Sequence, residues 1–208
     1  MTFDFSEFKN KKIIVTGSST GIGFETGIEF LNLGANVIFH GNQSINDLEA
    51  RVKTKSQSQN FKIFKSDFTD LSQVDDFMNN AINYLDGLDI LINNAGTMVG
   101  RYQLDTISEK DFLKIFDLNA KSAYFATKSA STIFKKQNYG NIINVSTISA
   151  RTGGSAGSSV YAASKAFVSG ITRSLVSELS PYNIRINAIS PGTIAVSYTH
   201  LTLPTRAV

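Results

Sequence analysis

Residues 12–23 read KIIVTGSSTGIG, and this stretch decides the fold. A short strand-like run, Lys12 to Val15, leads into a glycine-rich turn that opens directly into a segment of helical periodicity at 21–33. Glycine lets the backbone approach a pyrophosphate, and the free N–H groups at the start of a helix bind that anion. The stretch therefore predicts a strand, turn and helix that hold a nucleotide. A plain tight turn is the alternative, and three glycines in this context disfavour it.

The same alternation continues along the chain. Short apolar runs recur, and segments of helical periodicity separate them. The runs lie at 36–39, 61–64, 89–92, 141–145 and 184–189, and the helical segments at 44–57, 70–85, 107–137 and 159–179. The segment 107–137 is expected to break near Leu118-Asn119. Buried runs that alternate with helices indicate an α/β protein, a single domain with the doubly wound parallel sheet of a Rossmann fold.

Composition excludes several kinds of chemistry. The chain of 208 residues has no Cys and only two His, at 40 and 200. A thiol nucleophile is therefore impossible, and neither a metal site nor a Ser-His-Asp triad is expected. The net charge of +3 comes from scattered residues, which is not the pattern of a nucleic-acid-binding surface. No apolar run is long enough to cross a bilayer and no signal peptide is recognisable, so we expect a cytoplasmic protein without a membrane partner.

Tyr161 and Lys165 are the strongest candidates for acid–base work. They stand four residues apart on the predicted helix 159–179, which places them one turn apart on one face. A cation beside a phenol lowers its pKa from about 10 towards a usable value. Taken alone, this spacing also fits an ordinary surface pair. Its weight comes from the residues after the predicted strands, where ligands bind in such sheets.

Those strand-end residues resemble the classical short-chain dehydrogenases/reductases over about residues 9–195. The resemblance rests on motifs in family order: Thr-Gly-x-x-x-Gly-x-Gly at 16–23, Asp67, Asn93-Asn94-Ala95-Gly96, Asn119, Tyr161-x-x-x-Lys165 and Pro191-Gly192. It implies hydride transfer between a nicotinamide and a carbonyl or secondary alcohol. The chain is most similar to 3-oxoacyl-[acyl-carrier-protein] reductases. A sugar or polyol dehydrogenase, or a non-catalytic nucleotide-binding protein on the same fold, stays open.

The resemblance also implies catalytic roles. Tyr161 would exchange a proton with the substrate oxygen, and Lys165 would lower the pKa of Tyr161 and bind the nicotinamide ribose. Asn119 would hold a water that relays protons to Lys165. Thr147 stands where the family usually has Ser, in Asn144-Val145-Ser146-Thr147, and would orient the substrate carbonyl, with Ser149 as the alternative.

The cofactor residues follow from the same resemblance. They are Gly17, Ser18, Ser19, Gly21, Ile22, Gly23, Asn42, Asp67, Phe68, Asn94, Ala95, Gly96, Tyr161, Lys165, Pro191, Gly192 and Ile194. An NAD enzyme usually has a carboxylate at the end of the second strand, where this chain has Gly41. That difference favours NADP over NAD, which stays possible. Ser18, His40 and Asn42 are the expected uncharged partners of a 2′-phosphate.

The end of the sequence departs from the family. Residues 196–208 look like translated adapter sequence, so we expect a Rossmann-type domain at 1–195 and a non-native tail beyond it. On this interpretation the chain lacks the last strand and the substrate lid of its relatives. The expected substrate is a carbonyl compound, small or carried by an acyl-carrier protein. By resemblance, we expect the full-length parent to be a homo-oligomer, and specifically a homotetramer.

Overall fold

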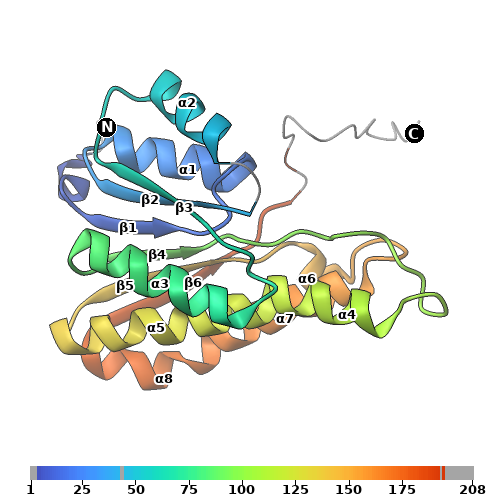
Figure 1. Ribbon diagram of the computed structural model, residues 1–208. Helices are drawn as coiled ribbons and strands as arrows, with labels where there is room; N and C mark the ends of the chain where they lie inside the picture. The colour runs from blue at the N-terminus through green and yellow to red at the C-terminus, as the bar shows by residue number, and fades with distance from the viewer. Residues whose placement is uncertain (1–3, 43–44, 193, 195–208) are drawn as a thin grey trace, which may run out of the picture.

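Six parallel strands form one sheet, with helices on both faces, in a computed structural model that describes residues 4–42, 45–192 and 194 (Figure 1). The strands are β1 (Lys12–Val15), β2 (Asn36–Gly41), β3 (Phe61–Lys65), β4 (Ile90–Asn93), β5 (Gly140–Val145) and β6 (Ile184–Ile189). Their order across the sheet is β3-β2-β1-β4-β5-β6. The order reverses between β1 and β4, and at this switch point the strand ends leave a crevice for a ligand. The predicted doubly wound sheet is confirmed.

Helices connect successive strands. They are α1 (Gly21–Asn32), α2 (Asn46–Lys55), α3 (Leu71–Leu85), α4 (Glu109–Phe116), α5 (Ser122–Gln137), α6 (Ser149–Thr152), α7 (Ser159–Ser174) and α8 (Val176–Leu179), with short 3-10 turns at Ser6–Phe8 and Ser180–Tyr182. Side chains cap two of the starts: Asp70 accepts from the backbone of Ser72 before α3, and Ser108 accepts from that of Asp111 before α4. Within the described parts of the chain, no helix is both long and apolar enough to cross a membrane.

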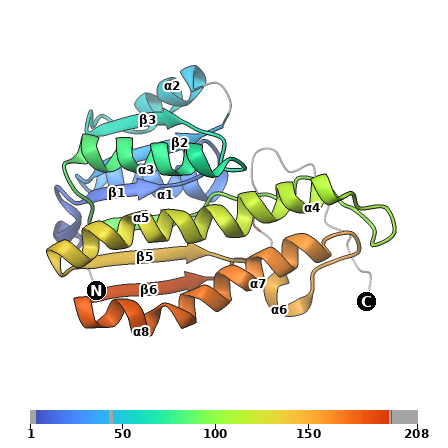
Figure 2. The same ribbon diagram turned by 60° about the horizontal axis from the view of Figure 1, so that its bottom comes forward.

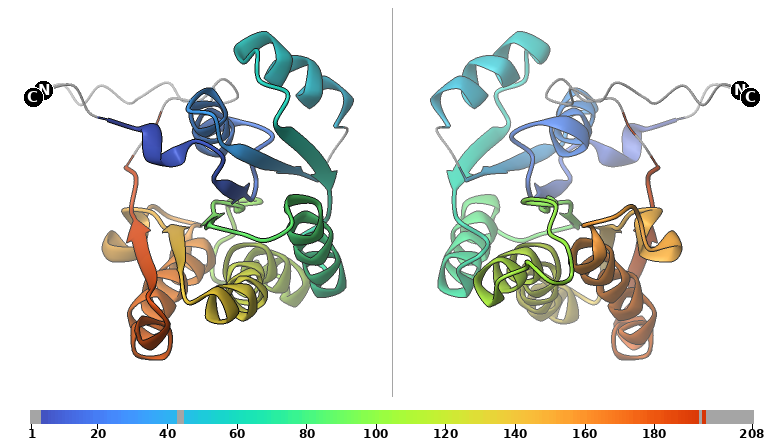
Figure 3. Two further views of the ribbon diagram at one scale, coloured as in Figure 1. Left: turned by 90° about the vertical axis from the view of Figure 1, so that its left-hand side faces the viewer. Right: turned by 90° about the vertical axis from the view of Figure 1, so that its right-hand side faces the viewer.

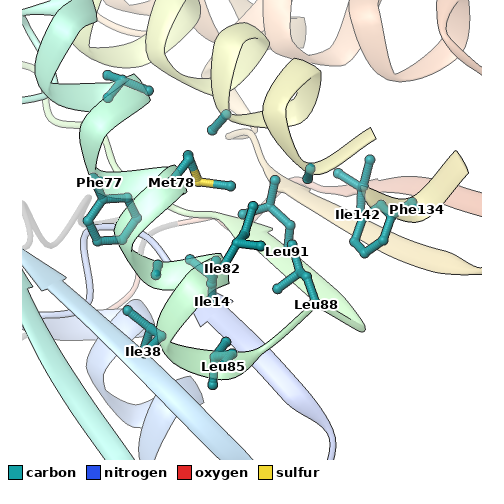
Figure 4. Packing of buried hydrophobic residues seen from close by; sticks show 14 of the residues in the cluster. Ile14, Ile38, Phe77, Met78, Ile82, Leu85, Leu88, Leu91, Phe134 and Ile142 are labelled. Atoms are coloured by element: carbon teal, nitrogen blue, oxygen red, sulfur yellow. The ribbon is translucent and has the colours of Figure 1, made fainter. Parts of the chain in front are cut away.

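Two apolar cores lie on opposite faces of the sheet. Helices α1 and α2 pack on one face, and α3, α5 and α7 pack on the other (Figures 2 and 3). Alternate residues of β1 divide between them, because successive side chains of a strand point to opposite faces: Ile14 joins the α3–α5 side, whereas Ile13 and Val15 join the α1 side. Figure 4 shows the core on the α3–α5 side, where α3 presents Phe77 and Met78.

The predicted break in the segment 107–137 takes a specific form. Between α4 and α5 the chain makes a π-helical turn, Asp117–Lys121, without leaving the helical path. A π-helical turn inserts extra backbone into a helix and often marks a functional position. Here it carries Asn119, which is fully buried. The expected tail at 196–208 lies outside the described residues.

Candidate active site

A cavity of about 610 Å³ opens at the carboxyl ends of β1, β4 and β5. Thirteen residues of the predicted site line it: Gly17, Ser19, Ile22, Asn42, Asn94, Ala95, Gly96, Thr147, Tyr161, Lys165, Pro191, Gly192 and Ile194. The sheet therefore brings together residues that are up to 177 positions apart in sequence, from Gly17 to Ile194. Ser18, Gly21, Gly23, Asp67, Phe68 and Asn119 are not among the lining residues.

The glycine loop is held against the loop after β4. The side-chain amide of Asn94 donates to the carbonyl oxygens of Thr16 (3.0 Å) and Gly17 (2.9 Å). Gly17 has φ +60°, and a Cβ there would lie 2.6 Å from Ala95 Cα, so only glycine fits. Gly23 has only the steric constraint, because its Cβ would overlap the Asn94 amide. Gly23 thus shapes the cradle without lining it.

Ser18 and His40 make their hydrogen bonds within the protein, although His40 also lines the cavity, so this geometry gives no support to the expectation that they bind a 2′-phosphate. The Ser18 hydroxyl donates to Val15 O at 2.6 Å and accepts from the backbone N–H of His40 at 2.8 Å. The His40 ring accepts from the Gly17 N–H at Nδ1 (2.9 Å), which leaves Nε2 to donate to Ser66 O (3.0 Å). Burial is the main reason that the pKa of His40 falls to about 4. Both side chains are used in holding the loop.

Phe68 and Asp67 contact the two residues His40 and Asn42 at the end of β2. Phe68 is buried and stacks on the His40 ring with the centroids 4.0 Å apart. Burial acts to raise the pKa of Asp67, but hydrogen bonds from Thr69 and Asn42 outweigh it and hold that pKa below its usual value. Among the three residues expected to meet a 2′-phosphate, only Asn42 both lines the cavity and is exposed.

Lys165 and Asn119 meet around Gly96. The Asn119 amide donates to the carbonyl oxygens of Thr97 and Ile115, each at 2.8 Å, while its buried Oδ1 receives no hydrogen bond from the described residues. A Cβ on Gly96 would contact this Oδ1 and lie 2.8 Å from Lys165 Nζ. The two side chains therefore face the same small space.

Lys165 is fixed by the end of β5. Its Nζ donates to Val145 O at 2.9 Å, and the Ser146 hydroxyl donates to the Lys165 carbonyl at 2.9 Å. Burial lowers the pKa of Lys165 to about 8. Tyr161, one turn earlier on α7, is half-buried and lines the cavity with it. A phenol and a cation thus share one wall, as the spacing predicted.

Thr147, and not Ser149, borders the cavity. Thr147 directly follows Ser146 at the end of β5, and its Oγ1 accepts from the Ser149 N–H at 3.3 Å. Ser149 itself begins α6 and is not among the lining residues. Of the two hydroxyls weighed for the substrate carbonyl, the geometry favours Thr147.

Sequence reasoning missed several lining residues. Thr20, Thr97 and Leu118 border the cavity, and each is the immediate neighbour of a predicted residue. Arg51 is a different case: it is not among the residues that line this cavity, but it lies on α2 and donates from Nη1 to the backbone oxygen of the lining residue Ser19 at 2.9 Å. A lone arginine on a predicted surface helix gives no signal in the sequence.

The residues present fit a nicotinamide dinucleotide. The Gly17 turn leaves room for backbone only, and α1 begins at Gly21 with its N-terminal N–H groups at the same end of the sheet. At the other end of the cavity, the Lys165 ammonium provides a donor, and the buried Asn119 Oδ1, which does not line the cavity, lies beside the lining residue Gly96 as an acceptor. This is the arrangement of a Rossmann-fold oxidoreductase.

Comparison with known proteins assigns the family. A family model described as short chain dehydrogenase matches residues 11–206, and the chain belongs to this family. It is 36% identical to a 3alpha-hydroxysteroid dehydrogenase of Mediterraneibacter gnavus, covering 90% of this chain and 75% of that protein. It is 31% identical to a 2-dehydro-3-deoxy-D-gluconate 5-dehydrogenase of Dickeya dadantii (96% and 78%) and 32% identical to a 3-oxoacyl-[acyl-carrier-protein] reductase of Thermotoga maritima (96% and 80%).

A solved structure agrees. The NADH-dependent reductase A1-R′ in complex with NAD superposes with a TM-score of 0.84 at 33% identity, covering 91% of this chain and 81% of that one. The protein is therefore an oxidoreductase that acts on CH–OH or carbonyl groups with a nicotinamide cofactor.

Proposed function

We propose that this protein is an NADP-dependent reductase that transfers a hydride between nicotinamide and a ketone or secondary alcohol, with a 3-oxoacyl group as its substrate class. One observation carries the proposal: Tyr161, Lys165 and Thr147 line the same cavity as the Gly17 turn. A binding module has no need for a phenol and a buried cation on one wall. The 32% identity to the Thermotoga maritima reductase supports the substrate class.

Each side chain has a distinct task. The nicotinamide supplies or accepts the hydride when it is bound. Thr147 donates its hydroxyl hydrogen to the carbonyl oxygen, and Tyr161 gives that oxygen a proton during reduction or takes it back during oxidation. With a pKa of about 8, Lys165 is charged in about nine of ten molecules at pH 7. It therefore remains a cation that favours the phenolate of Tyr161.

Asn119 completes the proton path. Its Oδ1 is buried and receives no hydrogen bond from the described residues, and it shares the space at Gly96 with Lys165 Nζ. A buried carbonyl oxygen without a donor costs about 1–3 kcal/mol, so this position favours a hydrogen-bond donor such as water. We therefore assign Asn119 the relay that returns protons from solvent to Lys165.

A keto-sugar acid is the second candidate substrate. The 31% identity to the Dickeya dadantii 2-dehydro-3-deoxy-D-gluconate 5-dehydrogenase favours it. The same cavity lining serves both substrates, because hydride transfer to a ketone needs the same acid and the same donor.

The test is a reduction assay with two substrates and two cofactors. Acetoacetyl-pantetheine and 2-dehydro-3-deoxy-D-gluconate are each supplied with NADPH or NADH, and kcat/KM is measured for wild type and Tyr161→Phe. We expect the acyl substrate and NADPH to give the highest value, and Tyr161→Phe to lose at least about a hundredfold. Preference for NADH rejects the cofactor assignment. Full activity in Tyr161→Phe rejects the mechanism.

A homo-oligomer, specifically a homotetramer, is part of the proposal. Helices α4, α5 and α7 carry the exposed aromatic side chains Phe112 (43%), Tyr124 (39%) and Phe167 (37%). These rings continue a chain of aromatic contacts through Phe116. Association of copies would cover them. Sedimentation measures the assembly directly, and a purely monomeric protein contradicts it. A cytoplasmic location stays an expectation from composition.

A further inference from the structure

Arg51 lies where the glycine loop meets the end of β2. Its Nη1 donates to Ser19 O at 2.9 Å, and its guanidinium carbon lies 4.5 Å from the centroid of the Phe24 ring. Ser19 lines the cavity, and a Cβ on Gly41 would lie only 3.1 Å from Ser19 Cβ. Arg51 is therefore anchored to the loop residue that borders the end of β2.

The end of β2 is where the two cofactors are told apart. A carboxylate there binds the 2′-hydroxyl of NAD, whereas a nearby arginine accommodates the 2′-phosphate of NADP. This chain has the uncharged Gly41 and Asn42 at that point. Ser18 is buried and donates its hydroxyl hydrogen to Val15 O, and His40 lines the cavity but has both ring nitrogens in hydrogen bonds, so neither side chain has a free donor for a phosphate.

Arg51 has the donors that such a phosphate needs. A guanidinium carries five N–H donors in a planar fork, and Ser19 O takes one of them. Asp47 is the acidic partner, but its Oδ2 lies 3.8 Å from Nη1 and is well exposed, so the pair is a weak one. The Phe24 ring supports one face of the guanidinium and limits its freedom.

We propose that Arg51 determines cofactor specificity by binding the 2′-phosphate of NADP. The inference rests on the proposed use of NADP and names the residue responsible for it. An arginine on α2 would then bind the 2′-phosphate, because this chain has no basic residue directly after β2.

Two adenine nucleotides test this without the nicotinamide end of the site. Adenosine 2′,5′-bisphosphate and adenosine 5′-monophosphate differ only by the 2′-phosphate, and isothermal titration calorimetry gives both dissociation constants for the 208-residue chain. We expect wild type to bind the bisphosphate at least about tenfold more tightly, as one charge-assisted contact allows. Arg51→Gln should abolish this preference, and Arg51→Lys should keep part of it.

Lys55→Gln is the matched control. Lys55 lies one turn further along α2, its Nζ is 5.9 Å from the centroid of the same Phe24 ring, and it pairs with Glu25 at 2.9 Å. The variant loses the same charge from the same helix, and we expect the preference to change by less than about twofold. Circular dichroism confirms that each variant is folded.

The outcomes separate the two claims. If wild type prefers the bisphosphate and Arg51→Gln keeps that preference, the role of Arg51 is wrong and NADP use stands. An equal loss in Arg51→Gln and Lys55→Gln also overturns it, because general charge then explains the effect. If wild type shows no preference, or binds neither nucleotide, the NADP proposal fails and the role of Arg51 fails with it.

Discussion

Acid should loosen the glycine loop through a single histidine. The His40 Nδ1 accepts from the Gly17 N–H, so this nitrogen must be unprotonated in the folded chain. A proton added there would place an N–H against an N–H and would charge a ring that is 3% exposed, stacked on Phe68 and in tilted contact with Phe77. We therefore predict that both stability and nucleotide binding fall as the pH drops from 7 to 4.5.

The magnitude follows from the two pKa values of His40. Burial holds its pKa at about 4 in the folded chain, against an ordinary 6.5, even though Ser66 O and the Asp67 charge act in the opposite direction. Between these values the unfolded chain binds a proton that the folded chain does not. Stability from this group is fully present above 6.5 and is lost as the pH falls towards 4. The total is about 3 kcal/mol, of which about 2 kcal/mol is lost between pH 7 and 4.5.

The assay is urea unfolding of wild type and His40→Gln at several pH values. A glutamine can still accept from the Gly17 N–H but does not titrate. We expect wild type to lose about 2 kcal/mol more than the variant between pH 7 and 4.5. Two curves that fall in parallel would refute the reasoning, because the loss would then belong to other groups.

Three further predictions concern the catalytic wall. Gly96→Ala places a methyl group against Asn119 Oδ1 and 2.8 Å from Lys165 Nζ, so kcat/KM should fall at least about tenfold. Urea unfolding should also show a stability loss of about 1–3 kcal/mol. Unchanged activity would contradict this geometry. Because burial lowers the pKa of Lys165 from an ordinary 10.5 to about 8, between these pH values the unfolded chain keeps a proton that the folded chain has lost. Wild type should therefore gain about 3 kcal/mol between pH 8 and 10.5, and Lys165→Met should not, as urea unfolding would show. Thr147→Ser should keep activity, whereas Thr147→Ala should lose about a hundredfold in kcat; an active Ala variant at 147 beside an inactive one at 149 would reassign the hydroxyl.

The strands could be predicted from sequence almost to the residue, for a physical reason. Each buried parallel strand is a short apolar run that ends where ligand or turn residues begin, as at Val15 and at Asn93. The π-helical turn at Asp117–Lys121 was predictable as an interruption but not in form. The apolar residues fall out of helical phase near Asn119, and a loop at this position would shift their phase in the same way.

Site residues could be predicted where their arrangement depends on spacing within one helix. They could not be predicted where it depends on contacts between separate elements. Tyr161 and Lys165 share a face because helix geometry fixes the spacing of residues four apart. Ser18 lies in the turn after β1 and accepts from the backbone N–H of His40 on the neighbouring strand β2, and no periodicity in either segment encodes that pairing. Arg51 reaches the glycine loop through the packing of α2 beside α1, which is a tertiary contact.

Burial sets the protonation of both ends of the cavity. It lowers the pKa of His40 to about 4 and that of Lys165 to about 8, so the two shifts have the same cause. Their consequences differ because the two lowered pKa values lie on opposite sides of neutrality. His40 stays neutral and can accept from the Gly17 N–H, while Lys165 stays mostly charged and can act on Tyr161. Between about pH 6.5 and 8 the loop keeps its acceptor at no cost in stability and the catalytic wall keeps its cation. Outside that range one end weakens before the other: acid acts on the nucleotide cradle, and alkali removes the charge beside the phenol.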